Sequence, residues 1–457
     1  MKKSYLLFFL ILTIHFAGLT QLQQVYSFQK DDTILKKNYF EQSMRKKNLL
    51  LADLNGQYAK DYKEIYNEQF KEIGGLLQST RSVTAPKAHG YLQSIVQKII
   101  AANPELKGTD VRVIFSRDWW PNAYSLGEGT ITINAGLMIF LDNEAQLVFI
   151  LCHELSHYYL QHTSKAIKEY VETVNSEAFK SELKRLSKEQ YRVNHQLELL
   201  TKSLAFDSRK HSRSNEAEAD LQAFNFMKKT GYDCGAIKTS LELLDKIDDS
   251  SLYKHLNVEQ VFNFSEYPFK KKWIQKESAI FSQLDEDDSP LSPAEKDSLK
   301  THPDCSKRIL LLADSIEKVE SAGKKFLVDE KIFNELKKDF FAEIIEQCYR
   351  NDNLSRNLYY SLLLLQENEN IPMAVYSVAR CLNDIYENQK NHTLGLMIDL
   401  ENKVYPGDYN LLLRMLSRLR LEEIAALNYS FCKEYYEQMK SYPDFVEEMK
   451  KIQKIKN

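Results

Sequence analysis

The sequence lacks several patterns that would indicate other classes of protein. Its six cysteines are scattered and form no CxxC pair, which argues against a zinc site made of cysteines. Beyond residue 19 there is no apolar run of about eighteen residues, so no membrane span is expected there. The net charge is only -3, which gives no reason to expect nucleic acid as a partner.

The bulk composition predicts a folded chain of more than one domain. A length of 457 residues fits two or three domains. The hydrophobic fraction of 43% is enough for a sizeable core, and no low-complexity tract is found. These properties argue against a wholly disordered protein.

The beginning of the chain predicts a signal peptide. The basic start MKK precedes an apolar run over residues 5–19, about as long as a signal-peptide core and short for a membrane span. Cleavage is expected after Thr20 or Ser27, so residues 1–27 are taken as the signal peptide. An uncleaved N-terminal anchor is the alternative. No cysteine follows closely, so the usual lipoprotein pattern is missing, and we expect a soluble, exported, periplasmic protein without a membrane span in its mature chain.

Hydrophobic periodicity predicts an α+β fold that is mainly α. Helix formers occupy residues 37–77, and apolar residues recur at helical spacing over 89–102. The pattern then changes to that of strands, over 111–115, 122–126 and 130–136, with Gly127 and Gly129 marking a turn. A small sheet therefore precedes the part of the chain that carries the chemistry.

The rest of the chain reads as helical. We expect helices over 144–165 and 214–231, a long exposed helix or helical hairpin over 163–210, and a loop over 285–303. Helix pairs after residue 315, divided near 368–372, suggest degenerate tetratricopeptide units. A plain helical bundle is the alternative.

The motif HELSH at residues 153–157 is the main sign of chemistry. On a helix, His153 and His157 lie one turn apart on one face, so both imidazoles can reach one tetrahedral zinc ion. Glu154 projects from the same turn and can contact a water on the metal. The preceding LVFILC is apolar, as expected of a buried helix, where ionisable groups are costly unless partnered. A surface helix with two unrelated histidines is the alternative.

A third metal ligand must come from elsewhere. His162 follows soon after the motif, but the glycine expected of three-histidine sites is missing, so we place it behind a ligand or on the surface. In SNEAEAD, Glu216 and Asp220 share a helical face, whereas Glu218 points nearly the other way. We assign Glu216 as the ligand and Asp220 as the acceptor for a histidine ring N–H. Taken alone, this segment could be an acidic solvated helix face.

Four segments in order carry a family resemblance. They are PNAYSLGEGTITINAGLM (121–138), NEAQLVFILCHELSHYYLQH (143–162), HSRSNEAEADLQAFNFMKKTGYD (211–233) and THPDCSKRI (301–309). Together they resemble the gluzincin peptidases related to the CAAX prenyl endopeptidase (peptidase family forty-eight), in their soluble exported branch. The resemblance implies a zincin-like metallopeptidase domain over 89–315 with one zinc ion (Zn2+) per chain. A helical extension over 28–88 would precede it, and an all-α region over 316–457 would follow.

The resemblance also implies roles for single residues. Glu154 would be the general base. His302 would stabilise the transition state or gate the zinc, with a loop histidine outside catalysis as the alternative. Arg213 would pair with nearby acidic residues. An extended substrate would bind along the edge strand, through Asn122, Ala123 and Tyr124. The alternative is that this strand is a simple core strand.

Three functions compete. The first is an endopeptidase for misfolded or misassembled exported proteins, including unfolded outer-membrane proteins. The second is a periplasmic chaperone or binding protein with a gated or inactive zinc site. The third is a structural metal site, which three ligands disfavour because they leave one position open. The intact HELSH together with Glu216 favours the first, and the lack of further spanning helices argues against prenylated substrates.

Overall fold

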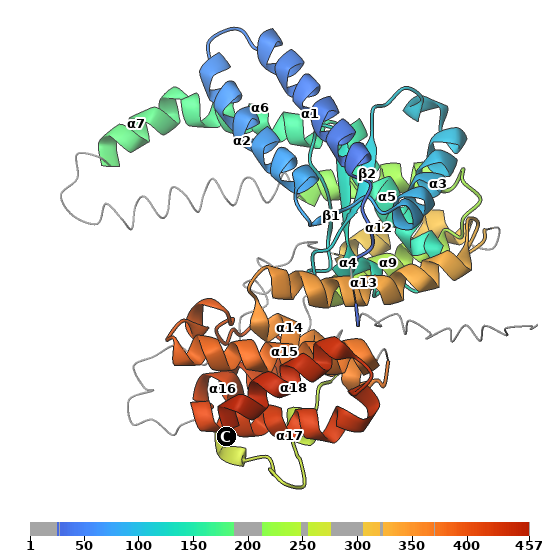
Figure 1. Cartoon of the computed structure of the whole chain (residues 1–457). Coiled ribbons are helices and arrows are strands. Elements are labelled where there is room, and N and C mark those ends of the chain that lie inside the picture. The colour runs from blue at the N-terminus through green and yellow to red at the C-terminus, as the bar shows by residue number, and fades with distance from the viewer. Residues whose placement is uncertain are drawn as a thin grey trace, which may run out of the picture.

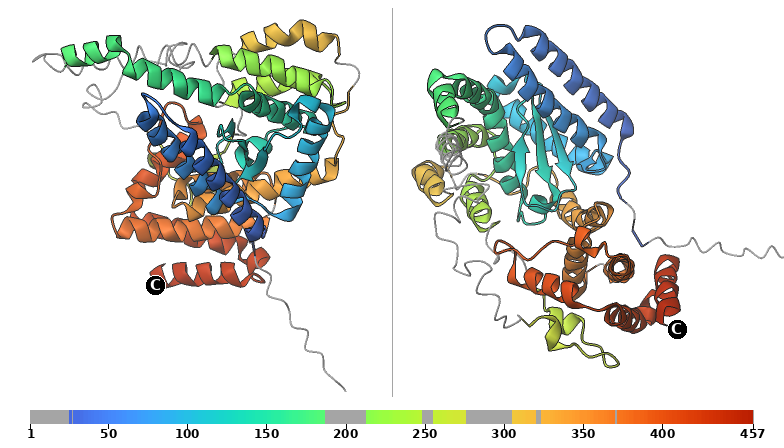
Figure 2. Two further views of the ribbon diagram at one scale, coloured as in Figure 1. Left: turned by 90° about the horizontal axis from the view of Figure 1, so that it is seen from above. Right: turned by 90° about the vertical axis from the view of Figure 1, so that its left-hand side faces the viewer.

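The fold is helical around one small sheet (Figures 1 and 2). The computed structural model describes residues 25–26, 28–186, 213–247, 255–275, 305–319, 323–369 and 371–456. Its element order confirms the α+β, mainly α class. The expected signal-peptide core, the second half of the helical hairpin over 163–210 and the loop with His302 lie outside these residues. Among the described residues, no helix is long and apolar enough to cross a bilayer.

A helical hairpin forms the N-terminal part. Helix α1 (Thr33–Asp53) begins at Asp32, whose carboxylate accepts two backbone N–H bonds of the first turn, and α2 (Ala59–Gln78) packs back against it. Figure 1 shows this pair projecting at the top of the molecule. The apolar face of α2, with Phe70, Ile73 and Leu77, forms a small core with Ile114 of the sheet.

The four-stranded sheet has the order β1-β2-β4-β3. Its strands are β1 (Ser82–Val83), β2 (Arg112–Ser116), β3 (Ala123–Ser125) and β4 (Thr130–Asn134). β2 and β4 run parallel, whereas β3 and β4 are antiparallel. The three strands expected over 111–136 are confirmed, and the two-residue β1 is too short for periodicity to detect. Within the described part of the chain, β3 is an edge strand.

The helix with HELSH packs directly on this edge. Helix α5 (Glu144–Tyr159) contacts β3, β4, α3 (Pro86–Ala102) and α9 (Gly235–Ile247). Asn143 caps it by accepting a hydrogen bond from the backbone N–H of Gln146. Every residue from Glu144 to Ser156 is buried. The apolar run before the motif therefore passes through the core, as the sequence predicts.

The predicted end of this helix, at Lys165, is wrong. α5 ends at Tyr159, and Gln161 adopts a left-handed conformation with φ 57°. A new helix, α6 (His162–Asn175), starts there and is followed by α7 (Glu177–Leu186). Neither glycine nor asparagine marks this stop, so the usual helix-ending signals are missing from the sequence.

Glu144 fixes the start of α5 to the rest of the core. This carboxylate is 0% exposed and accepts hydrogen bonds from two phenol groups and three backbone amides. The donors are the hydroxyls of Tyr91 (2.8 Å) and Tyr232, and the N–H groups of Leu327 (2.9 Å), Val328 (2.8 Å) and Asp329 (3.2 Å). They join α3, the segment before α9 and the segment before α13 (Glu330–Arg350).

We expect Glu144→Gln to lower the free energy of unfolding by about 2–3 kcal/mol, because an amide nitrogen would face donors that now share a buried carboxylate. Urea-induced unfolding followed by circular dichroism measures this change. Glu105→Gln, at a surface carboxylate bonded to Lys229, is the control and should unfold like the wild type. Equal midpoints for both variants would contradict the role of Glu144.

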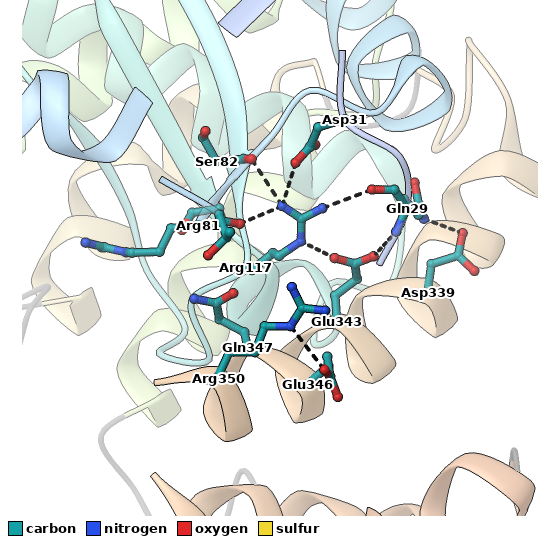
Figure 3. Close-up of polar contacts among 12 residues, drawn as sticks. Gln29, Asp31, Arg81, Ser82, Arg117, Asp339, Glu343, Glu346, Gln347 and Arg350 are labelled. Carbon is teal, nitrogen blue, oxygen red and sulfur yellow. Dashed lines mark hydrogen bonds and ion pairs between the residues drawn. The ribbon is translucent and has the colours of Figure 1, made fainter. Parts of the chain in front are cut away.

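Residues 28–32, here called the N-terminal strap, cross from the sheet to α13. Arg117 is fully buried and joins the strap to α13. Its guanidinium pairs with Asp31 of the strap (3.1 Å) and with Glu343 of α13. The backbone N–H of Gln29 donates to the other oxygen of Glu343 (2.8 Å). Figure 3 shows these groups converging on Arg117.

The C-terminal part consists of helices packed on one another. They are α14 (Leu354–Gln366), α15 (Ile371–Lys390), α16 (Gly407–Arg418), α17 (Leu421–Met439) and α18 (Pro443–Lys456). α13 lies between α4 (Ala135–Met138) and α14, and α15 packs on α14, α17 and α18 (Figure 1). The predicted break near 368–372 is confirmed, whereas the likeness to tetratricopeptide units stays a prediction.

Candidate functional site

Two helices bring three potential metal ligands together. His153 and His157 come from α5, and Glu216 comes from the helical segment 213–227. Nε2 of His153 lies 3.0 Å from Nε2 of His157 and 3.4 Å from Oε2 of Glu216. Nε2 of His157 lies 3.3 Å from Oε1 of Glu216. Among the described residues, these are the only three side chains whose donor atoms gather in this way.

The spacing of these donor atoms fits a tetrahedral cation. Ligand atoms about 2.0–2.1 Å from a tetrahedral zinc ion lie about 3.3 Å from one another. The closest separations, 3.0–3.4 Å, agree with that value, with each histidine approaching a different oxygen of Glu216. Two imidazole nitrogens and one carboxylate oxygen are also a donor set that zinc accepts, with a fourth position left for another ligand.

The electrostatics of the cluster favour positive charge. Burial would lower the pKa of His153, but the carboxylates of Glu216 and Asp220 raise it to about 10. Burial would likewise raise the pKa of Glu216, yet His153, His157 and Arg308 hold it well below its usual range. The negative charge of the two carboxylates can be balanced either by a proton on His153 or by a metal cation among the donors.

Asp220, which the sequence analysis expects to accept a histidine ring N–H, lies behind the cluster. Its Oδ1 is 2.9 Å from Nδ1 of His153, and its side chain is 0% exposed. Burial would raise the pKa of Asp220, but the hydrogen bonds from Arg308 and His153 lower it. An ionised Asp220 that accepts the Nδ1 hydrogen leaves Nε2 of His153 with a lone pair towards the cluster.

Arg308 is the residue that sequence reasoning missed. It lies on α12 (Cys305–Glu317), and its Nε and Nη2 contact the two oxygens of Asp220 at 2.5 and 2.7 Å. Its Nη1 lies 3.0 Å from Oε2 of Glu216. Arg308 is inside the segment THPDCSKRI, in which only His302 was singled out. The signal available was a basic residue on a short amphipathic helix, which does not by itself indicate a buried site.

Glu154 is buried beside the cluster, on the side of the edge strand. Its side chain is 5% exposed, and burial raises its pKa against the opposing effect of the two histidines. The backbone of Ser125 in β3 hydrogen-bonds to this carboxylate. A small cavity of about 10 Å³, lined by Ala123, Phe149 and His153 among others, adjoins it.

The edge strand turns the backbone of alternate residues away from the sheet. Asn122 accepts from Asn134, and Leu126 donates to Thr130, so these positions bond to β4. In an antiparallel pair, hydrogen-bonded positions alternate with positions whose N–H and C=O groups point away from the partner strand. Ala123 and Ser125 therefore direct their backbone groups to the free edge, where the N–H of Ser125 meets Glu154, whereas Asn122 and Tyr124 bond within the sheet.

The other expected site residues are placed as follows. Arg213 is exposed at the beginning of the segment 213–227, and its pairing with acidic neighbours stays a prediction. His162 is buried beside His157. His302 lies outside the described residues. A larger cavity, of about 1450 Å³, lies between the N-terminal strap, α3, α13 and α14, and none of its lining residues belongs to the cluster.

Comparison with known families decides the assignment. The model of peptidase family M48 matches residues 86–315, just over half of the chain, and this range holds the whole cluster. The chain belongs to peptidase family M48. By its family it is a protease, a hydrolase of peptide bonds.

Two curated relatives resemble part of this M48 peptidase. Both are named Beta-barrel assembly-enhancing protease, one from Escherichia coli (strain K12) and one from Shigella flexneri. Each is 28% identical over 176 residues, which is 37% of this chain and 35% of the relative. The chain thus spans about a third of the length of the curated relatives that it matches.

Proposed function

We propose that this chain is an exported, zinc-dependent endopeptidase with His153, His157 and Glu216 as the zinc ligands. The observation that carries the proposal is the convergence of these three side chains, whose closest donor atoms are 3.0–3.4 Å apart, beside a buried carboxylate. When bound, zinc lowers the pKa of a water towards about 7 and polarises a peptide carbonyl. Membership of family M48 supports a peptidase, and the donor set supports the metal.

Glu154 acts as the general base in this proposal. Its carboxylate accepts a proton from the attacking water and passes it to the nitrogen of the leaving amine. Burial raises the pKa of this carboxyl, which makes it a better proton acceptor than an exposed glutamate. The hydrogen bond from Ser125 holds it close to the edge strand, on which the substrate would lie.

The substrate binds as an added strand along β3. Ala123 supplies both of its backbone groups and Ser125 its carbonyl oxygen, so main-chain hydrogen bonds align the peptide irrespective of most of its side chains. Such binding requires an extended substrate, which a folded protein rarely offers and an unfolded chain does. Asn122 and Tyr124 would contribute indirectly, because their backbone groups pair with β4 and hold the edge strand in position.

We infer that the clients are unfolded, β-rich exported proteins. The name of the two relatives refers to β-barrel assembly, and the signal-peptide pattern over residues 5–19 predicts export to the periplasm. The helices of the C-terminal part would hold such clients near the cluster. The alternative, a periplasmic chaperone with a gated or inactive zinc site, remains as an outcome of the test below.

The test is proteolysis that depends on zinc. The mature protein is incubated with an unfolded outer-membrane β-barrel protein and, in parallel, with an unfolded all-helical protein. Metal content is measured by mass spectrometry before and after a chelator. We expect one zinc per chain, cleavage of the β-rich substrate, loss of cleavage on chelation, and recovery with one equivalent of zinc.

The outcomes separate the alternatives. Cleavage that persists without metal would contradict a metallopeptidase. Equal cleavage of both substrates would support the peptidase and contradict the proposed clients. One bound zinc with no cleavage, together with suppressed aggregation of the β-rich substrate, would favour the chaperone.

A further inference from the structure

His162 lies against a metal ligand because the chain turns back after α5. In a continuous helix, a residue five positions after His157 would point about 140° away from it. The left-handed Gln161 ends α5 instead and makes His162 the first residue of α6. Nδ1 of His162 then lies 2.9 Å from Nδ1 of His157, and His162 is only 4% exposed.

The second nitrogen of His162 faces a carboxylate. Its Nε2 lies 3.2 Å from Oε2 of Glu218, on the same helical segment that carries Glu216 and Asp220. Glu218 was given no role from the sequence, since it points away from the face shared by the other two. The turn at Gln161 brings His162 to the side of the segment 213–227 from which Glu218 projects.

These contacts can fix which nitrogen of His157 carries hydrogen. An ionised Glu218 only accepts, so His162 donates from Nε2 and keeps a lone pair on Nδ1. That lone pair accepts the Nδ1 hydrogen of His157. Nε2 of His157 is then free of hydrogen and directs its lone pair at the cluster, which is the state that a metal ligand needs.

The two histidine ligands are therefore supported in different ways. His153 is backed by Asp220, which is fully buried and clamped by Arg308. His157 is backed through His162 by Glu218, whose side chain is 54% exposed. The first support ends at a fully buried carboxylate, whereas the second ends at an exposed one.

We propose that His162 is a positioning residue that, together with Glu218, orients His157 and thereby sets the affinity of the site for zinc. The proposal rests on the proposed function, because it assigns His157 as a zinc ligand. It gives two residues, outside the ligand set and the general base, a role in holding the metal.

The experiment measures zinc affinity by competition with a chromophoric chelator, using the full mature chain. Loss of a residue that supports a metal ligand typically weakens metal binding 10–100-fold. We expect a loss in this range for His162→Phe, which keeps a ring but no acceptor, and a smaller loss for Glu218→Ala. His162→Gln should recover part of the affinity, because its amide oxygen can accept from His157.

A second readout separates positioning from folding. The visible absorption of the cobalt-substituted protein reports ligand geometry and should change in His162→Phe. Thermal unfolding of the metal-free protein should not differ from the wild type. His89→Phe is the matched control, because His89 is a half-buried histidine bonded to Tyr39, away from the cluster.

The possible results are distinct. Wild-type affinity and an unchanged cobalt spectrum in His162→Phe would overturn this proposal alone. A wild type without zinc affinity would overturn the proposed function and this inference with it. Equal losses in His162→Phe and His162→Gln, with metal-free unfolding also altered, would show a packing role and likewise overturn positioning.

Discussion

Glu154→Gln is expected to abolish measurable cleavage while the protein keeps its zinc. An amide cannot accept the proton of the attacking water, and general-base catalysis contributes about 10²–10⁴-fold to rate. The proposed zinc donors are His153, His157 and Glu216, which this change leaves in place. The measurement is kcat/KM for a quenched fluorescent peptide, together with zinc content per chain.

The control is Glu172→Gln on α6. Glu172 is an exposed carboxylate near Lys168 on the same helix, so its loss should leave both activity and zinc unchanged. A Glu154→Gln enzyme with more than about a tenth of wild-type kcat/KM would rule out Glu154 as the base. Loss of zinc along with activity would instead assign Glu154 to the metal.

Arg308→Leu is expected to cost about 3–5 kcal/mol of stability, as is typical when one partner of a buried ion pair is removed. Asp220 is 0% exposed and would keep its charge with only His153 as a partner. Glu216, 3.0 Å from Nη1 of Arg308, would lose its nearest cation as well. Urea unfolding of the metal-free and the zinc-loaded protein measures the change.

The metal-free protein should be affected more than the zinc-loaded one. In the proposed holoenzyme, zinc neutralises Glu216, so Arg308 is then needed mainly by Asp220. Arg308→Lys should be intermediate, because a lysine keeps the charge but cannot contact both oxygens of Asp220 with two parallel N–H groups. Arg185→Leu, at an exposed pair with Glu182, is the control. If Arg308→Leu unfolds at the same midpoint as this control, the clamp contributes nothing to stability.

The parts of the site that the sequence predicted are those that depend on one helix at a time. His153 and His157 are four residues apart, as are Glu216 and Asp220, and a helical turn alone puts each pair on one face. The three longer strands and most helices follow from periodicity in the same way. These predictions need no knowledge of how distant segments meet.

The parts that could not be predicted depend on a turn without a sequence signal or on tertiary packing. Gln161 is left-handed although it is not glycine, and without that turn His162 would face away from His157. Arg308 lies 88 residues after Asp220, and no periodic pattern links the two. Which buried charges pair with each other depends on how the helices pack, and the sequence alone does not show this packing.

The N-terminal strap has a consequence for the order in which the molecule assembles. The bond between Gln29 and Glu343 closes a loop of 314 residues. Closing so long a loop costs conformational entropy, so such distant contacts form after the local structure between them. A chain made from its N-terminus has long finished the strap when α13 is synthesised. Asp31 can pair with Thr84 and Arg117 early, whereas the contact between Gln29 and Glu343 must wait for α13. The strap is therefore fixed in two steps, and the end of it nearer the N-terminus is fixed last.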